Sequence, residues 1–146
     1  MVDTGINPTS DVMTKFNAVK TEHSLGWIVL EFGCSNPKKK SPDLIQVAQE
    51  GAKGSTFEQL KEHLPRASVR FFVYDCKYQV PGTTKEKVAL VNWSDDDASS
   101  KLKMLSASGF ENLKKKFQGI GCSFEIHDYD DLNTEYVHNR IAELCN

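Results

Sequence analysis

Apolar residues recur with the period of a helix in several segments of the chain. Residues 8–20 carry them at intervals of three and four, and Thr9 or Ser10 is placed to cap the start of that helix. Residues 55–64 predict a short capped helix that ends before a proline. Residues 131–145 predict a closing helix. Its inward side chains are expected to be Leu132, Tyr136, Val137, Ile141 and Leu144.

Strand patterns fill the intervals between these helices. Residues 26–34 predict one strand, and residues 43–52 a shorter, more polar one suited to a sheet edge. Residues 68–80 and 87–93 predict two central strands, joined by PGTTKE, that are apolar on both alternating sets of positions. Residues 122–129 predict a last strand with one apolar face. Strands with two apolar faces need cover on both sides, so we expect an α/β/α sandwich.

The longest helical pattern runs from Ala98 to Phe117 and has two contrasting faces. At about 100° per residue, its large apolar side chains group around Leu113, and Met104 lies about 180° away. The surroundings of Met104 on that outer side are Lys103, Ala107, Ser108, Glu111, Lys114 and Lys115. A flexible thioether among charged and small residues is typical of a docking ridge. A single exposed methionine on a solvated helix is the plainer alternative, and the pattern alone names no partner.

Composition narrows the class of protein. A length of 146 residues, with 39% hydrophobic and 26% charged residues, fits a single globular domain spanning residues 1–146. The formal net charge of −2 provides no general field for nucleic acid or membrane. We expect no membrane span and no secretory signal, which indicates a cytoplasmic protein. The run PKKK at residues 37–40 is compatible with a nuclear-import signal, although a solvated turn explains it better.

No residue pattern predicts catalysis, a cofactor or a metal. The four histidines fall at no metal-ligand spacing with the cysteines, which are expected to be reduced thiols. These cysteines are Cys34, Cys76, Cys122 and Cys145. Asp95 to Asp97, followed by Ser99, weakly resemble a calcium loop but lack its glycine and glutamate. Favourable charge at a helix N-terminus explains these aspartates better. We therefore expect a protein that is not an enzyme.

Residues 93–117, WSDDDASSKLKMLSASGFENLKKKF, resemble without a gap the signature of the actin-depolymerising factor (ADF)/cofilin family. FNAVK at residues 16–20, TGI at residues 4–6 and VYDCKYQV at residues 73–80 are also similar to segments of that family. The matches keep their order from about residue 4 to residue 143. The resemblance implies an ADF-homology, gelsolin-like fold: a five-stranded mixed sheet flanked by two pairs of helices.

The resemblance also implies a function. Members of the family are monomers that bind actin subunits (G-actin) and filaments (F-actin), prefer the ADP form, and twist and sever filaments. In the family the long helix enters a cleft between two actin subdomains, so the Met104 side chain would be removed from water in the complex. Central anchors of this kind usually carry most of the binding energy, whereas charges at the rim mainly raise the association rate.

When the binding positions of the family are matched to this sequence, the resemblance implies two actin-contacting surfaces. The monomer-binding surface would comprise Thr4, Gly5, Ile6, Lys101, Lys103, Met104, Glu111, Lys114 and Lys115. The filament-binding surface would comprise Lys85, Lys87 and Arg140, although Lys87 also fits an ordinary edge cation.

Two forms of regulation follow from the same positions. Thr4 stands where the family carries a phosphorylated serine, and an unmodified terminus is the alternative. Four lysines could also hold a phosphoinositide headgroup in competition with actin. They are Lys101, Lys103, Lys114 and Lys115.

The chain departs from the family pattern at several positions. Gly109 sits in mid-helix and Phe110 replaces a lysine, while Asp95 takes the place of a turn proline. On the last helix Asn139 and Glu143 replace an acidic and a basic residue, which weakens the expected filament site. A coactosin-like filament side-binder and a glia-maturation-factor-like debrancher are therefore kept as alternatives, although both lack the full pattern seen here as KLKM.

Overall fold

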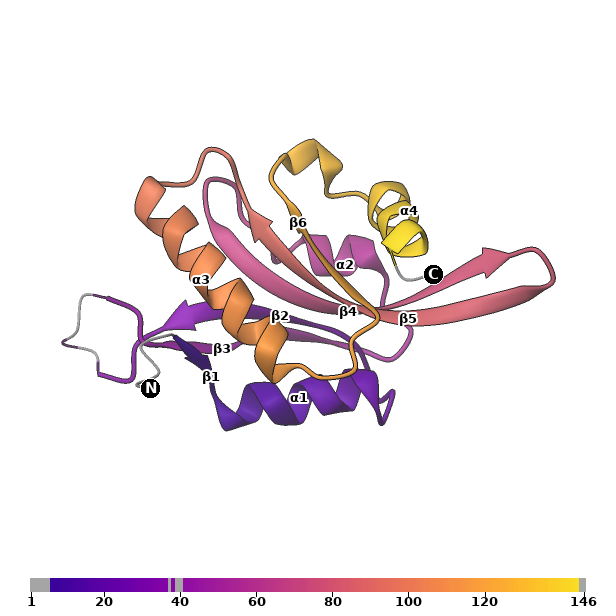
Figure 1. Cartoon of the computed structure of the whole chain (residues 1–146), viewed down its shortest axis with the longest axis horizontal. Helices are drawn as coiled ribbons and strands as arrows, with labels where there is room; N and C mark the ends of the chain where they lie inside the picture. Colours follow the sequence, from indigo (N-terminus) through magenta and orange to yellow (C-terminus); the bar gives the residue numbers. More distant parts are fainter. Residues whose placement is uncertain (1–5, 37, 39–40, 145–146) are drawn as a thin grey trace.

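The computed structural model describes residues 6–36, 38 and 41–144, which form a mixed sheet with helices on both faces (Figure 1). In chain order the elements are β1 (Asn7–Pro8), α1 (Ser10–Lys20), β2 (Leu25–Gly33), β3 (Leu44–Ala52), α2 (Phe57–Lys61), β4 (Val69–Val80), β5 (Thr83–Ser94), α3 (Ser100–Lys116), β6 (Cys122–Ile126) and α4 (Thr134–Leu144). A single 3-10 turn, Tyr129–Asp131, precedes α4.

The strand order across the sheet is β1-β3-β2-β4-β5-β6. The central pairs are antiparallel, and the outer pairs β1 with β3 and β5 with β6 are parallel. The five long strands and the mixed character of the sheet are as predicted. The additional strand β1 has only two residues, too few to show any period in the sequence. It covers the outer edge of β3, which was expected to be the sheet edge.

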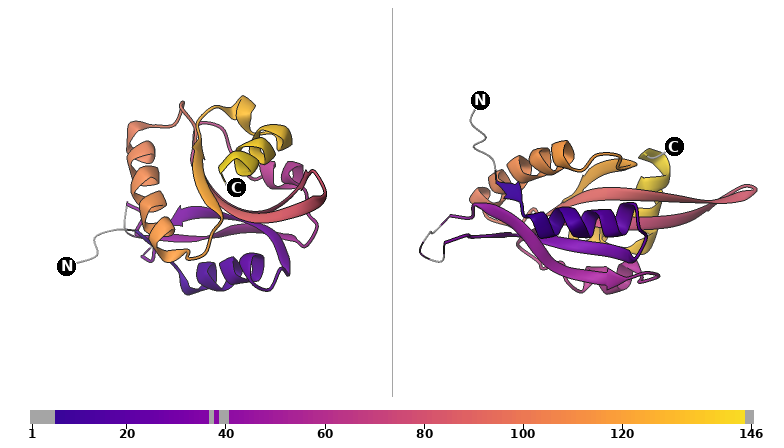
Figure 2. Two further views of the ribbon diagram at one scale, coloured as in Figure 1. Left: turned by 45° about the vertical axis from the view of Figure 1, so that its right-hand side comes forward. Right: turned by 90° about the horizontal axis from the view of Figure 1, so that it is seen from below.

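Each face of the sheet has its own core, which confirms the sandwich. Helices α1 and α3 pack on one face, where the rings of Phe16 and Phe117 stack with centroids 4.1 Å apart. Helices α2 and α4 pack on the other, where Phe57, Val137 and Ile141 are fully buried. Figure 2 shows α2 and α4 beside each other, on the opposite side of the sheet from α1.

The starts predicted for the first two helices are confirmed by their caps, whereas the closing helix α4 begins three residues after its predicted start at residue 131. The Thr9 side chain accepts a hydrogen bond from the Val12 amide, and Thr56 forms a reciprocal capping box with Gln59. Helix α2 ends at Lys61, three residues before the predicted end. Among the described residues, none of the helices combines the length and apolar character needed to cross a bilayer.

Strands β4 and β5 form a much longer hairpin than the sequence pattern predicted. The ladder continues to Val80 opposite Thr83, so that only Pro81 and Gly82 form the turn. The segment PGTTKE is therefore mostly strand. Its polar residues are exposed because the end of the hairpin projects beyond the helices, to the right in Figure 1. A sequence pattern based on burial does not detect a strand that is solvated on both faces.

Two other expectations are wrong. Leu144 is 44% exposed because it occupies the last position of α4 and is not part of the core. Cys122 is disulfide-bonded, whereas Cys34 and Cys76 are free thiols, as expected. Cys145 lies outside the described residues. The remaining inward positions of α4 are buried or partly buried, as predicted.

Gly109 allows α3 to lie close to the sheet. A Cβ atom at this position would lie 2.9 Å from Cζ of Phe71 and 3.1 Å from Cζ of Phe32. These two rings pack edge to face with centroids 5.5 Å apart, and Phe71 is fully buried. The glycine that departs from the family pattern is thus matched to two phenylalanine rings beneath the helix.

We expect Gly109→Ala to destabilise the protein by about 1 kcal/mol. Forcing the methyl group against these rings costs about 1–3 kcal/mol, which exceeds the gain of about 1 kcal/mol in helix propensity. Urea unfolding measures the difference. Ser108→Ala, on the exposed side of the same turn, is the control and should change the free energy of unfolding by less than about 0.5 kcal/mol. A stabilised Gly109→Ala protein would contradict this account.

Candidate functional site

Helix α3 begins at a well-defined turn after β5. The Ser99 hydroxyl caps the helix by accepting a hydrogen bond from the Leu102 amide at 3.2 Å. Asp95 is buried, and its carboxylate accepts hydrogen bonds from the amides of Ala67, at 2.6 Å, and Asp97, at 3.0 Å. Asp95 therefore fixes the turn with hydrogen bonds where the family has a proline. Asp95 to Asp97 come shortly before the N-cap Ser99, so they lie at the N-terminal end of α3 and not within its first turn, which contains no acidic residue.

The two faces of α3 are oriented as the sequence predicted. Leu113 is fully buried, with Phe110 and Phe117 beside it, whereas Met104 is 74% exposed. Leu105 lies at the edge of the core and is partly buried. The methionine therefore contributes little to the core, and its exposure needs another explanation.

A buried polar contact fixes the rotation of α3 on the sheet. Ser106 is completely buried, and its hydroxyl donates a hydrogen bond of 2.6 Å to Oδ1 of Asn92 on β5. The Asn92 amide in turn donates to Glu125 on β6 at 3.3 Å. A rotation of the helix would leave buried polar atoms without partners, which costs about 1–3 kcal/mol for each. No feature of the sequence indicates this contact, because a serine in a helix is usually exposed.

The exposed residues on the side of this helix that carries Met104 form what we call the α3 outer face. It consists of Lys101, Lys103, Met104, Ala107, Ser108, Glu111, Lys114 and Lys115, all of them exposed. Glu111 pairs with Lys114 at 2.7 Å, and Lys114 also lies 4.7 Å from the centre of the Phe110 ring. The face is thus a cationic surface with one apolar side chain near its start.

The start of the described chain lies beside α3. The carbonyl oxygen of Ile6 accepts a hydrogen bond of 3.1 Å from the Asn112 side chain. This contact places Ile6 beside α3, the helix that carries the other described residues of the predicted monomer-binding surface. Thr4 and Gly5, which belong to the same predicted surface, lie outside the described residues, and so does most of the lysine run at residues 37–40.

The residues predicted to bind filaments lie on two elements. Lys85 is exposed and Lys87 is partly buried, opposite Tyr78 and Cys76 on β4. Those two partners belong to the core beneath α2 and α4, so the lysines share that face of the sheet with α4. Arg140 lies on α4 itself, where Nη1 is 3.4 Å from a carboxylate oxygen of Glu143.

Arg140 also lies close to part of the α3 outer face. It lines a shallow pocket of about 440 Å³ with Glu111 and Lys114, across strand β6. The structure therefore brings Arg140 together with two residues assigned to the monomer surface. Neither of the hairpin lysines lines that pocket.

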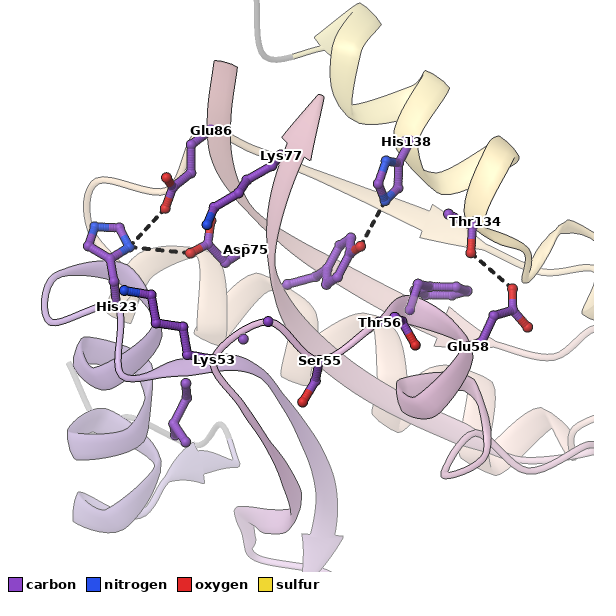
Figure 3. A pocket seen from close by; sticks show the side chains of 15 residues that line it. His23, Lys53, Ser55, Thr56, Glu58, Asp75, Lys77, Glu86, Thr134 and His138 are labelled. Atoms are coloured by element: carbon purple, nitrogen blue, oxygen red, sulfur yellow. Dashed lines mark hydrogen bonds and ion pairs between the residues drawn. The ribbon is translucent and has the colours of Figure 1, made fainter. Parts of the chain in front are cut away.

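A larger pocket of about 600 Å³ opens where β2 begins and β4 continues beyond it (Figure 3). The last pair of β2 with β4 is Trp27 with Tyr74. In this pocket the Tyr74 hydroxyl lies 2.7 Å from Nε2 of His138 on α4. Burial lowers the pKa of His138 and raises that of Tyr74, so this hydrogen bond joins a neutral imidazole to a protonated tyrosine.

We expect NMR titration to give His138 a pKa below the ordinary value of about 6.5. With the lower pKa in the folded protein, the unfolded chain binds a proton on His138 more readily than the folded chain does. The contribution of His138 to the free energy of unfolding is therefore present in full above pH 6.5. It decreases as the pH falls below that value. The variant His138→Gln should reduce this acid dependence in urea unfolding. Titration of His138 at or above 6.5 would contradict this account.

Comparisons with known proteins agree with this architecture. The family described as cofilin/tropomyosin-type actin-binding protein matches residues 5–142. Actophorin from Acanthamoeba castellanii is 28% identical over 136 residues, covering 93% of this chain and 94% of actophorin.

Solved structures show the same fold at lower sequence identity. The crystal structure of Streptomyces griseoflavus cofilin has a TM-score of 0.81 at 22% identity, and the match covers 95% of this chain and 98% of that one. The NMR structure of human coactosin-like protein has a TM-score of 0.73 at 11% identity, covering 98% of this chain and 92% of that one. The family match over nearly the whole chain shows that this protein belongs to the ADF/cofilin family.

Proposed function

We propose that this protein binds actin, in monomers and in filaments, and that it promotes filament depolymerisation and severing. The observation that carries the proposal is the 74% exposure of Met104 on the same helix whose Leu113 is fully buried. A helix packed on one side only can insert its other side into a groove of another protein. Family membership makes a cleft on actin the expected groove.

Binding would remove the Met104 side chain from water. Burying a methionine side chain contributes about 1.5–3 kcal/mol, and its flexibility lets it fit an irregular cleft. Ala107 and Ser108 leave room for a partner to approach the helix closely. Lys101 and Lys103 would pair with acidic groups of actin and mainly raise the association rate. The preferred form of actin is expected to be the ADP form, as in the family.

Contacts along a filament would add a second surface. Lys85, Lys87 and Arg140 are the candidates, and their side chains come from the hairpin and from α4. The pairing of Arg140 with Glu143 weakens this surface, because the arginine must exchange one carboxylate for another. We therefore expect severing to be weaker than monomer binding.

Charge would regulate the α3 outer face. Lys101, Lys103, Lys114 and Lys115 could attract a phosphoinositide headgroup, at about 1 kcal/mol per lysine near an anionic membrane. Such binding would compete with actin. Phosphate on Thr4 would add about −1.5 to −2 charges at pH 7 near the same helix and weaken binding to an acidic partner. On this proposal the protein works as a monomer in the cytoplasm, on the cytoskeleton, and catalyses no reaction.

We expect Met104→Ala and Lys103→Ala each to weaken binding to ADP-actin monomers by more than about 1 kcal/mol, or at least fivefold in Kd. Titration of fluorescently labelled ADP- and ATP-actin measures both affinities. Lys116→Ala removes an exposed cation of the same helix that is not part of the α3 outer face, and it should leave the affinity unchanged. If neither Met104→Ala nor Lys103→Ala changes the affinity, the α3 outer face is not the binding site.

We expect Lys85→Ala and Lys87→Ala to reduce the binding of the protein to filaments while monomer affinity stays the same. Filament binding is measured by co-sedimentation, and severing by fluorescence microscopy of single filaments. Lys77→Ala is the control, since this exposed lysine also lies on the hairpin but alternates to the opposite face. Equal loss of monomer and filament binding in the two variants would contradict a separate filament surface.

A coactosin-like side-binder or a glia-maturation-factor-like debrancher is the second candidate function. The side-binder is kept as a candidate because this chain shares its fold with human coactosin-like protein. Co-sedimentation at several protein ratios separates them. A depolymerising factor moves actin into the supernatant, whereas a side-binder pellets with filaments and leaves the amount of pelleted actin unchanged.

A further inference from the structure

Three potential metal ligands converge in the larger pocket, away from the α3 outer face. They are His23 from the turn between α1 and β2, Asp75 from β4 and Glu86 from β5 (Figure 3). Nδ1 of His23 lies 3.2 Å from Oδ2 of Asp75 and 3.0 Å from Oε1 of Glu86. One ligand atom from each residue lies within 4.8 Å of the other two.

The fold brings these residues together from distant parts of the sequence. His23 adopts a left-handed backbone with φ of 54°, just after the end of α1. Glu86 stands opposite Lys77 in the hairpin, and Asp75 lies two residues before that lysine on β4. Asp75 and Glu86 therefore project from the same face of the hairpin, toward the end of α1. Such a set has no sequence spacing that could predict it.

The hydrogen bonds within the cluster do not satisfy its polar groups. Nδ1 of His23 carries at most one proton, yet it faces two carboxylate oxygens. The Asp75 side chain is only 8% exposed, and its Oδ1 is buried with no hydrogen-bond partner. An unpartnered carboxylate oxygen in a buried position costs free energy unless a cation or a donor reaches it. Burial, and then the neighbouring Glu86, raises the pKa of Asp75 to about 6.

We propose that His23, Asp75 and Glu86 form a binding site for a divalent transition-metal ion of the zinc type. Zinc accepts nitrogen and oxygen ligands at about 2.0–2.2 Å, which in a tetrahedron places neighbouring ligand atoms about 3.3 Å apart. The two distances from Nδ1 of His23, 3.2 and 3.0 Å, are close to that value. All three residues line the pocket, so water or a group from a partner could reach a bound ion from there as a fourth ligand.

The ligand set separates zinc from the common alkaline-earth ions. Calcium and magnesium prefer sites made of oxygen atoms alone, and calcium takes six to eight of them. This cluster offers an imidazole nitrogen and two carboxylates, which suits zinc, cobalt or nickel better. Lys53 and Lys77 also line the pocket, and their charges oppose any cation there. The free energy gained by metal coordination must therefore exceed this repulsion, so we expect the site to bind Zn²⁺ with moderate affinity.

A bound ion would join the end of α1 to the base of the β4–β5 hairpin. Glu86 lies between Lys85 and Lys87 on β5, so the metal would hold the strand that carries both lysines. None of the three ligands belongs to the α3 outer face. The metal site therefore stands or fails independently of actin binding through α3.

The site is tested on the full-length protein after treatment with a chelator. Isothermal titration calorimetry with Zn²⁺ measures affinity and stoichiometry, and Co²⁺ absorption reports the ligands. His23→Gln and Glu86→Gln each remove one ligand. The matched control is His127→Gln, because His127 lies 3.5 Å from a single carboxylate, that of Glu125. Circular dichroism and metal-free thermal unfolding verify that every variant is folded.

We expect one Zn²⁺ per chain, with an affinity that falls at least about tenfold in His23→Gln and in Glu86→Gln and stays unchanged in His127→Gln. The Co²⁺ spectrum should lack a charge-transfer band from thiolate, and Ca²⁺ and Mg²⁺ should bind more weakly than Zn²⁺. The proposal is overturned by absence of saturable Zn²⁺ binding, by a thiolate band, or by folded His23→Gln and Glu86→Gln proteins that bind Zn²⁺ as the unaltered protein does.

Discussion

The arrangement of α3 on the sheet is the constraint on which the candidate site depends. Leu113 and its apolar neighbours occupy the core, and the buried Ser106 hydroxyl donates to Asn92 on the strand below. Apolar burial alone would tolerate some rotation of the helix, whereas the polar contact tolerates little. Together they keep Met104 and its surrounding cations in water. The exposure of this surface is thus a consequence of how the core is packed.

The departures from the family pattern have physical counterparts in this chain. Gly109 lets the helix approach the rings of Phe71 and Phe32, so its low helix propensity is offset by close packing. Phe110 turns inward and is buried, which removes a cation from the helix without leaving an apolar side chain exposed. Asp95 replaces a rigid proline with two hydrogen bonds to the backbone. The neighbourhood of α3 is therefore repacked locally, while its outer face keeps the pattern KLKM.

Burial patterns predicted those parts of the molecule that are shaped by burial. The α/β/α layers, the cap at Thr9 and the two faces of α3 follow from apolar spacing and turn chemistry. Features governed by solvated backbone or by distant contacts could not be predicted in this way. The extension of β5 from Thr83 to Glu86 is polar, β1 is too short for a period, and Leu144 lies at a helix end. The cluster of His23, Asp75 and Glu86 joins segments up to 63 residues apart, as their numbers show, so only the folded chain brings it together.

The most direct measurement is the rate at which hydrogen peroxide oxidises Met104 in the free protein and in its complex with ADP-actin, followed by mass spectrometry. Oxidation of a methionine depends on access to its sulfur atom. Met13, a partly buried residue of α1 that packs against the core, is an internal reference. The account predicts rapid oxidation of Met104 in the free protein and strong protection in the complex, with little change at Met13. Equal rates at Met104 in the free and actin-bound protein would contradict it.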